Sequence, residues 1–403
     1  MAESFASACS KILENVSLLP TESVALLDLA GRVLAEEVRA PWDMPRWDNS
    51  AMDGFAIHAD DCTAHQPLVI EGYLPAGCNT DGVMVRPGRA VRIMTGAPTP
   101  DGCAAVIPIE ETEEVDGQLV IKGRIRPGDH VRVRGEDLRM GELVADVGTL
   151  LRPAEINMLA AFGRCSVKVY RRPRVAILST GDELVEPGEP VGPGQIVNSN
   201  AYSLAAAVRQ VGGEPCLLGI AGDQRDSLIE KLAGSVDADV LITTAGVSMG
   251  DLDLVCEVLE ELGVKQLFWK IDIKPGRPTA FGIRAGQPVF SLPGNPVSSM
   301  ITFEELVRPA LLKMMGHQRV TRHPVRAIIQ EPVAKKPGRL QFLRVRVIDD
   351  GRQLVAMSSG DQNTGILRTL LRANGIAVLP ADRGRIEAGE TVNIHLLSEV
   401  DVR

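Results

Sequence analysis

A chain of 403 residues with 45% hydrophobic and 24% charged side chains is long enough for about two to four globular domains, which excludes a fibre or a disordered tail. Its net charge of −9 disfavours nucleic-acid binding, because no surplus of basic residues is available to displace counterions from phosphate. No apolar run approaches the roughly 20 residues that cross a bilayer, and Met1 to Glu14 is too acidic for a signal peptide, so we expect a cytoplasmic protein that does not bind membranes.

Residues 1–41 carry apolar side chains at helical spacing, and Thr21 is placed to cap a second helix there. Residues 142–170 return to this pattern, with Pro153 at a helix start. We predict that these two segments pack together as a helical linker domain, interrupted by a β-rich inserted domain over 42–141. The strands expected in the insertion are residues 66–71, 89–94, 118–122 and 130–134.

From residue 171 to 322, buried strands alternate with Gly-containing turns and helices, which predicts a doubly wound α/β domain. The strands are expected at 174–179, 215–220, 240–244 and 287–292, and the helices at 201–211, 226–232 and 252–262. Residues 323–403 form short runs between turns and carry a modest basic surplus, and we predict a small C-terminal β-barrel. The overall class is therefore multidomain, α+β and α/β.

Two loops of the α/β domain are suited to an anion. Residues 179–183 and 243–253 follow strands at the edge where such sheets bind ligands, and their backbone N–H groups are free to donate. Each loop alone is weak support, because such turns usually only connect elements. The Walker and dinucleotide-binding glycine patterns are both absent, which argues against an ATPase or a dehydrogenase.

Polar residues gather at these loops and at the strand ends. They are Asp182, Glu183, Asn198, Asn200, Asp223, Ser248, Asp253, Lys270, Lys274 and Asn295. Each one is more simply a helix cap or a solvated turn, but together they fit a site for a phosphorylated ligand with Mg²⁺. Strand alternation would place Lys270, Asp272 and Lys274 on one face, as a wall of that site.

Neither the cysteines nor the histidines indicate a metal site. The seven cysteines are scattered and never spaced C-x-x-C, and the six histidines show no H-E-x-x-H pattern. In the inserted domain, segments 47–56 and 92–98 are polar and rich in turns, as functional loops are. An Asx turn at Asp48 and Asn49 and a glycine turn after Asp53 would explain the first segment equally well.

Seven motifs occur in a fixed order along the chain. They are DNSAMDG at 48–54, MTGAP at 94–98, RGED at 134–137, LSTGDEL at 178–184, GVSMGDLD at 246–253, KPGRP at 274–278 and LPGNPVS at 292–298. In these motifs, over nearly its whole length, the chain resembles the MoeA family of molybdopterin molybdenumtransferases, which includes the E domain of gephyrin. The departures are mild: Ala245 stands for Gly, Phe55 for Tyr, Arg277 for Lys, and Thr364 for Ser.

The resemblance implies that the α/β domain binds molybdopterin and that the chain forms an elongated homodimer, with a cleft shared between the α/β domain of one subunit and the β insertion of the other. It implies the reaction of adenylyl-molybdopterin with molybdate, which yields molybdenum cofactor and AMP, with Mg²⁺ or a similar ion. A pterin adenylyltransferase is then a candidate partner. Two alternatives remain: a non-catalytic scaffold or peptide-binding protein, and a stand-alone adenylyltransferase, which is disfavoured because those proteins resemble the α/β domain alone.

Position by position, the resemblance implies catalytic roles for Asp53, Thr95, Asp137, Glu183 and Asp253, with Asp53 and Asp253 as candidate Mg²⁺ ligands. The anion-binding loops and the resemblance together predict the substrate-binding residues. These are Arg132, Ser179, Gly181, Asp223, Ser248, Gly250, Asp253, Lys270, Lys274, Pro275, Asn295, Arg344 and Thr364. Molybdate is expected at the junction of the α/β domain and the barrel, held by Lys274, the backbone after Pro275, Arg344 and Thr364.

Overall fold

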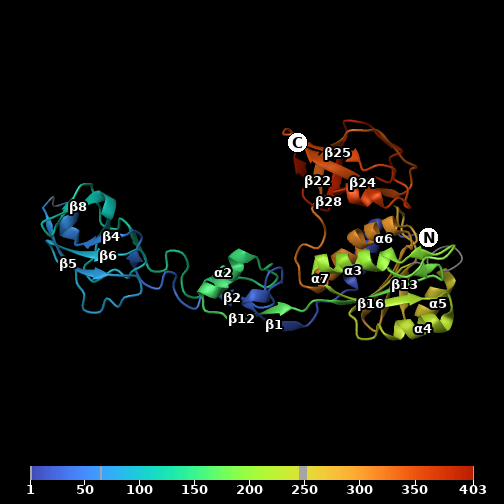
Figure 1. Cartoon of the computed structure of the whole chain (residues 1–403), viewed down its shortest axis with the longest axis horizontal. Coiled ribbons are helices and arrows are strands. Elements are labelled where there is room, and N and C mark those ends of the chain that lie inside the picture. The colour runs from blue at the N-terminus through green and yellow to red at the C-terminus, as the bar shows by residue number, and fades with distance from the viewer. Residues whose placement is uncertain (1, 64–65, 245–251, 403) are drawn as a thin grey trace. The chain divides into compact units, whose positions relative to one another are not determined.

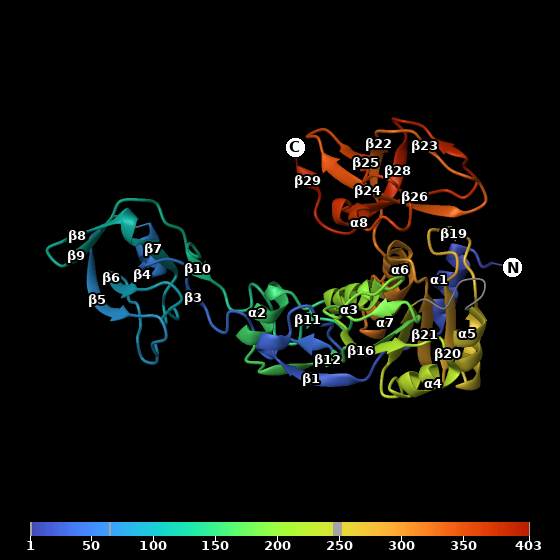
Figure 2. The same ribbon diagram turned by 45° about the vertical axis from the view of Figure 1, so that its right-hand side comes forward.

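The computed structural model describes residues 2–63, 66–244 and 252–402. The chain divides into two compact units, seen from two sides in Figures 1 and 2. The first unit comprises Met1–Ala35, Val147–Pro153 and Ser166–Arg403, and the second comprises Glu36–Asp146 and Ala154–Cys165. Separate hydrophobic clusters fill the two units.

The second unit is built around a six-stranded sheet with the order β7-β4-β6-β5-β9-β8. Its strands are β4 (Gly54–Ile57), β5 (Leu68–Leu74), β6 (Arg89–Ile93), β7 (Ala105–Pro108), β8 (Thr112–Val115) and β9 (Gln118–Ile121). Alternate residues fill two apolar clusters, one containing Phe55 and Ile107 and the other containing Ala56 and Val106. The β-rich character expected for this insertion is confirmed.

Smaller elements complete this unit. They are β2 (Val38–Arg39) paired with β11 (Leu143–Ala145), β3 (Asn49–Ser50) paired with β10 (Val131–Arg132), the 3₁₀ helices η2 (Ala59–Cys62) and η3 (Ile109–Glu111), and α2 (Pro153–Ala161). Helix α2 begins at Pro153, as predicted, because a proline at the first helical position loses no hydrogen bond.

The prediction that residues 1–41 and 142–170 are mainly helical is largely wrong. Besides α2, only α1 (Phe5–Glu14) is an α-helix there, and η1 (Leu26–Asp28) is a single 3₁₀ turn. Thr21 caps no helix: β1 (Thr21–Ala25) pairs antiparallel with β12 (Ser166–Tyr170), and Val24 lies opposite Val167. β-Branched residues gain from such cross-strand packing, which local helical periodicity does not reveal. Helix α1 instead joins the α/β core of the first unit, where Ala8 and Ile12 are buried.

A six-stranded sheet with the order β16-β13-β17-β21-β20-β18 forms the α/β domain of the first unit. The strands are β13 (Arg174–Thr180), β16 (Glu214–Ala221), β17 (Val240–Thr244), β18 (Lys265–Phe268), β20 (Ala280–Arg284) and β21 (Gln287–Leu292). The first four in the spatial order are parallel, and β20 runs antiparallel to both of its neighbours, β21 and β18. A short parallel pair, β14 (Leu184–Val185) and β15 (Ile196–Val197), follows β13.

Helices cover both faces of this sheet, as the doubly wound prediction requires. They are α3 (Ser199–Val211), α4 (Arg225–Ala233), α5 (Leu252–Glu261), α6 (Pro296–Thr302), the π-helix η4 (Phe303–Val307) and α7 (Arg308–Met314). One face packs with α1, α3, α6 and α7 around Ile177 and Phe290, and the other with α4 and α5 around Leu178 and Leu241. The carboxyl ends of the four parallel strands meet at one edge.

A closed five-stranded barrel forms the C-terminal domain, in the order β24-β25-β22-β28-β26 with β26 returning to β24. The strands are β22 (Val325–Ile329), β24 (Leu340–Asp349), β25 (Leu354–Ser358), β26 (Gly375–Leu379) and β28 (Thr391–Leu396). The remaining elements are β19 (Ile273–Lys274), β23 (Val333–Ala334), β27 (Arg385–Ile386), β29 (Asp401–Val402) and α8 (Arg368–Arg372). The predicted barrel is confirmed.

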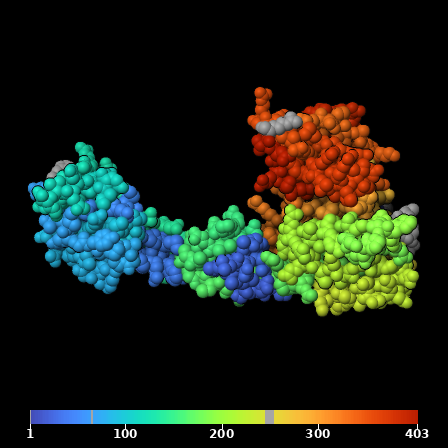
Figure 3. All heavy atoms as spheres, viewed as in Figure 1, coloured from blue at the N-terminus to red at the C-terminus, as the bar shows by residue number. Residues whose placement is uncertain are grey.

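The barrel adjoins the α/β domain within the first unit (Figure 3). Leu343, Val345 and Ala377 point into the barrel core, whereas Phe342 and Ile376 on the opposite face belong to the hydrophobic cluster of the α/β domain. Among the residues that the structure describes, no helix is long and apolar enough to cross a membrane.

Candidate functional site

A chain of buried hydroxyls lies beneath the carboxyl edge of the α/β sheet. Ser179 at the end of β13 donates to Asn198 Oδ1 at 2.9 Å, and Thr244 at the end of β17 donates to Ser179 Oγ at 3.2 Å. All three residues are buried. Ser179 and Asn198 are therefore engaged in holding this edge together, so the loops above it start from a fixed base.

Two carboxylates are locked across neighbouring strand ends. The backbone N–H of Asp223 donates to Asp182 Oδ1 at 3.0 Å, and that of Asp182 lies 3.4 Å from Asp223 Oδ2. Gly181 has a φ of 137°, and a Cβ there would lie 2.4 Å from a carboxylate oxygen of Glu183. The structure thus brings Gly181, Asp182, Glu183 and Asp223 together, as the sequence predicted.

Lys274 reaches the barrel through backbone pairing. Strand β19 is parallel to β24, with Lys274 opposite Gln341, and a cis peptide bond joins Lys274 to Pro275. The expected continuous strand over 270–274 is wrong, because the backbone N–H of Ile271 donates to Arg277 O at 3.0 Å and only the last two residues join the sheet. Burial still alternates: Ile271 and Ile273 are fully buried, whereas Lys270 is half-buried and Lys274 exposed.

The guanidinium of Arg344 is the most unusual group of the first unit. Arg344 is 1% exposed, yet its Nη2 contacts only the carbonyl oxygens of Asp361 at 3.2 Å and Asn363 at 3.3 Å. Its Nε is buried without a hydrogen-bond partner, and no carboxylate of the described residues forms an ion pair with it. Burial lowers the pKa of Arg344, and the negative charge of Asp361 opposes this shift without cancelling it.

The loop that covers Arg344 is fixed by Gln362, a residue that the sequence did not single out. Gln362 Oε1 accepts from the Arg344 backbone N–H at 3.0 Å, and its Nε2 donates to Arg344 O at 3.1 Å. Two residues further on, Thr364 Oγ1 accepts from Asn295 Nδ2 at 2.9 Å, which joins the barrel loop to the start of α6. Gln362 thus binds both backbone groups of Arg344, as a neighbouring strand would. A glutamine in this role has no recognisable sequence pattern.

In the second unit, Asp53 and Thr95 form a tight pair. Thr95 donates to Asp53 Oδ1 from its hydroxyl at 2.7 Å and from its backbone N–H at 2.8 Å. Arg132 lies opposite Asn49 in the β3–β10 pair, and the backbone N–H of Asp137 donates to Met44 O at 3.0 Å. The Asx turn considered at Asp48 is wrong, since this carboxylate accepts from the distant Arg134 backbone N–H at 2.7 Å.

We expect Thr95→Val to raise the pKa of Asp53 towards its ordinary value of 3.8. The Thr95 hydroxyl, followed by the Thr95 backbone N–H, holds this pKa down by donating to the ionised form. A depressed folded-state pKa gives stabilisation that is present at neutral pH and is lost as the pH falls through that pKa. An NMR titration of the Asp53 carboxyl in both proteins measures the shift, and identical titration curves would contradict the assignment.

Gly54 has a structural reason for ending the DNSAMDG motif. A Cβ at this position would lie 1.9 Å from Ile107 O on the neighbouring strand. We expect Gly54→Ala to destabilise the second unit by roughly 3 kcal/mol, because a backbone oxygen cannot move aside. Gly123→Ala is the control, since its Cβ meets only the flexible side chain of Glu111. Thermal unfolding of both variants tests this, and equal melting temperatures would refute the steric explanation.

Some predicted residues fall outside this description. Ser248, Gly250 and Ala245 lie outside the described residues, and Asp253 is in the first turn of α5 without a described side chain. Among the residues that the structure describes, no three acidic, histidine or cysteine side chains gather as metal ligands. The described candidates therefore form two separate groups. Ser179, Gly181, Glu183, Asp223, Lys270, Lys274, Pro275, Asn295, Arg344 and Thr364 are in the first unit, and Asp53, Thr95, Arg132 and Asp137 are in the second.

Three family models together match most of the chain. Residues 3–163 match the MoeA N-terminal region, residues 176–313 a probable molybdopterin-binding domain, and residues 326–397 the MoeA C-terminal region. A molybdopterin molybdenumtransferase of Haemophilus influenzae is 38% identical over 400 residues, covering 97% of this chain and 98% of the relative. The chain belongs to the MoeA family.

Other MoeA relatives agree. Molybdopterin molybdenumtransferase 2 of Mycobacterium tuberculosis is 37% identical over 387 residues, covering 92% of this chain and 94% of the relative. A crystal structure of a molybdopterin biosynthesis MoeA protein from Pyrococcus horikoshii has a TM-score of 0.85 and 31% identity, and the alignment covers 99% of this chain and all of that one. MoeA membership thus extends over every domain, including the barrel that carries Arg344.

Proposed function

We infer that this chain is a molybdopterin molybdenumtransferase, which inserts molybdenum in the biosynthesis of the molybdenum cofactor by converting adenylyl-molybdopterin and molybdate into the cofactor and AMP. Its curated relatives of nearly equal length carry this enzyme name. The single structural observation that supports it best is Arg344, a fully buried cation that forms no ion pair with a carboxylate of the described residues and has an unpartnered Nε. Burying an unpaired charge is costly, so such a group indicates a site for an anion.

Molybdate fits the surroundings of Arg344. Lys274 lies opposite Gln341 in the β19–β24 pair, and Arg344 follows three residues later on β24, at most about 10 Å along the strand. Because this offset is odd, the Lys274 side chain would have to reach the anion around the start of β24. Thr364 supplies a hydroxyl beside Asn295. We propose that Lys274, the backbone after Pro275, Arg344 and Thr364 hold the dianion while the two dithiolate sulfurs of the pterin displace two of its oxo groups, which take up protons and leave as water. Two cations and a hydroxyl would stabilise the negative charge of bound molybdate, which water solvates when the ion is free.

The pterin nucleotide is proposed to bind at the carboxyl edge of the α/β sheet. Four of the residues proposed for this site lie at strand ends or within a few residues after them: Ser179, Gly181, Asp223 and Lys270. The proposal also includes Ser248, Gly250 and Asp253, at and before the start of α5. Ordered strand ends at the carboxyl edge of a parallel sheet are where such domains bind phosphorylated ligands. Glu183 and Asp253 would then orient the diphosphate bond that breaks when AMP leaves.

Mg²⁺ is proposed as the ion that offsets the diphosphate charge. Both Thr95 donors occupy Oδ1 of Asp53, which leaves Oδ2 without a hydrogen bond from a described residue. Mg²⁺ is commonly bound by one or two carboxylates together with substrate phosphates, so Asp53 with Asp253 is an acceptable donor set once the nucleotide is present. When bound, the ion would supply electrostatic stabilisation of the leaving phosphate. Asp137 and Arg132 would support Asp53 from the same unit.

A homodimer follows from this proposal. Asp53 and Thr95 belong to the second unit and Lys274 and Arg344 to the first, and family resemblance indicates that the two sets meet between two copies of the chain. A cytoplasmic location and delivery of the nucleotide by a pterin adenylyltransferase are further proposals of the same kind. The scaffold alternative has no support in the names of the relatives.

The function is tested by incubating the full chain with adenylyl-molybdopterin and Mg²⁺, with and without molybdate, and following AMP by chromatography. We expect AMP release that rises with molybdate and saturates. AMP release that ignores molybdate, or no release at all from a folded protein, would refute the proposal. Vanadate or sulfate in place of molybdate provides a control for general oxyanion effects.

A further inference from the structure

A row of three paired residues crosses the barrel face that packs on the α/β domain. Arg344 on β24 lies opposite Ile376 on β26, and Ile376 lies opposite His395 on β28. Directly paired residues point to the same face of a sheet, and Ile376 is buried in the α/β core cluster. Arg344 and His395 therefore both face the α/β domain, and their strands lie about 10 Å apart, which is twice the spacing of neighbouring strands.

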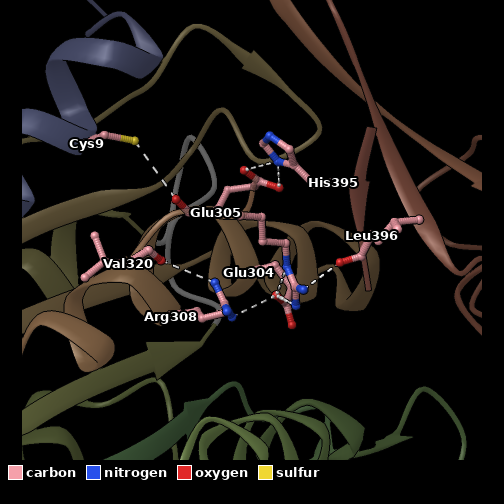
Figure 4. A network of polar contacts seen from close by, with 8 residues as sticks. Cys9, Glu304, Glu305, Arg308, Val320, His395 and Leu396 are labelled. Carbon is pink, nitrogen blue, oxygen red and sulfur yellow. Dashed lines mark hydrogen bonds and ion pairs between the residues drawn. The ribbon is translucent and has the colours of Figure 1, made fainter. Parts of the chain in front are cut away.

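His395 ends this row in contact with a buried carboxylate. Its Nδ1 lies 2.9 Å from Oε1 and 3.0 Å from Oε2 of Glu305, whose side chain is 5% exposed (Figure 4). Glu305 belongs to the π-helix η4, and its carbonyl oxygen also lies 4.0 Å from Cys9 Sγ of α1. Glu305 of the α/β domain thus holds strand β28. This strand pairs with β26, which in turn pairs with β24, the strand that carries Arg344.

The neighbouring residue, Glu304, holds the same strand at its next position. Arg322 donates to Glu304 Oε2 at 2.7 Å and to the carbonyl oxygen of Leu396 at 2.5 Å, and Arg308 lies 3.9 Å from the same carboxylate (Figure 4). Glu305 contacts the strand directly, whereas Glu304 reaches it only through Arg322. Residues 395 and 396 are consequently fixed from two sides.

The same helical rod reaches the barrel a second time. Segments α6, η4 and α7 follow one another without a break, and Asn295 occupies the position directly before α6, where its side chain makes no capping hydrogen bond. Asn295 donates to Thr364 beside Arg344, whereas Glu305 binds His395 at the far end of the row. The rod therefore holds the barrel at two points, and the Arg344 strand, which is joined to β28 through β26, is positioned by both.

We propose that Glu305 and His395 are positioning residues that set the place of Arg344 relative to Lys274, and so determine how well the site takes up molybdate. This inference rests on the proposed function. Apolar contacts such as Phe5 with Phe342 already hold the α/β domain and the barrel together, and a single polar contact such as Glu305–His395 adds little net stability. A directional contact at this place fixes one arrangement among those that the apolar surfaces allow.

The test compares two substitutions of His395 in the full-length protein. His395→Leu removes the donor, whereas His395→Asn keeps an amide nitrogen near the position of Nδ1. We expect His395→Leu to raise the KM for molybdate about fivefold or more with kcat and the affinity for the pterin nucleotide within about twofold of wild type, and His395→Asn to restore most of the loss. Glu305→Gln should resemble His395→Asn, because its amide oxygen still accepts.

Arg346→Leu is the matched control, since Arg346 lies on the same strand as Arg344 but forms an exposed ion pair with Asp401. Its KM should equal that of wild type. An unchanged molybdate KM in a folded His395→Leu protein would overturn the inference, and so would a parallel loss of kcat, nucleotide affinity and melting temperature that His395→Asn fails to rescue. If the wild-type protein itself shows no molybdate-dependent AMP release, the proposed function fails instead.

Discussion

Arg344→Met should raise the molybdate concentration for half-maximal activity at least about tenfold, equivalent to ~1.4 kcal/mol, without lowering the melting temperature of the free protein. Methionine fills a similar volume but carries no charge. The wild-type guanidinium has only carbonyl partners and an unpaired Nε in its buried position. Replacing such a group by an apolar side chain is often neutral or stabilising, whereas the bound oxyanion loses a charge-assisted hydrogen bond of roughly 1.5–3 kcal/mol.

The molybdate response and the melting temperature together show whether Arg344 binds molybdate or only supports the barrel. Molybdate titration at saturating pterin nucleotide gives the first quantity, and thermal unfolding without ligands gives the second. A large loss of stability together with an unchanged molybdate response would place Arg344 in the barrel architecture alone. A loss of nucleotide affinity instead would assign it to the other ligand.

Two inactive variants should complement each other if the cleft is shared between two copies. Asp53→Asn alters the second unit and Lys274→Ala the first, and we expect each alone to reduce kcat/KM by about a hundredfold or more. Coexpressed with different affinity tags, they form mixed dimers in which one of the two clefts has both native residues. A random mixture of subunits should regain about one quarter of wild-type activity, since half of the dimers are mixed.

Doubly tag-purified mixed dimers should then reach about half of the wild-type activity. Mixed dimers that stay as inactive as either parent would contradict the shared cleft. A protein that is monomeric by light scattering and fully active in the assay would also contradict the shared cleft. Asp53→Asn mixed with Arg344→Met is an independent pair for the same comparison when it is assayed at molybdate concentrations well below saturation, because Arg344 is also in the first unit.

Much of the fold follows from local patterns. The strand at 240–244 and the strand at 287–292 are short runs that are mostly apolar, and both are placed as expected because nothing in the tertiary structure competes with them. The barrel was also predictable, since its turns punctuate short strands. Residues 21–25 were not predictable, because their strand depends on a partner more than a hundred residues away in the chain.

Some residues of the candidate site could likewise be predicted from the sequence, and others could not. Gly181, Asp182 and Glu183 follow a strand directly, so their proximity to Asp223 could be inferred from parallel-sheet geometry. Lys274 and Arg344 could be named through family resemblance, but neither the burial of Arg344 nor its unpartnered Nε can be read from an Arg-Val-Arg segment that looks like a surface strand. Gln362 and the Glu305–His395 pair depend on contacts between distant segments and have no local signal.

The most direct test of the central claim is a single-turnover reaction in which AMP and pterin-bound molybdenum are quantified in the same sample. Adenylyl-molybdopterin bound to the protein is mixed with molybdate, AMP is measured by chromatography, and molybdenum on the released pterin is measured by mass spectrometry. The proposed function predicts equal amounts of the two products in the wild-type protein and neither product without molybdate. AMP that forms while the pterin carries no molybdenum would contradict it.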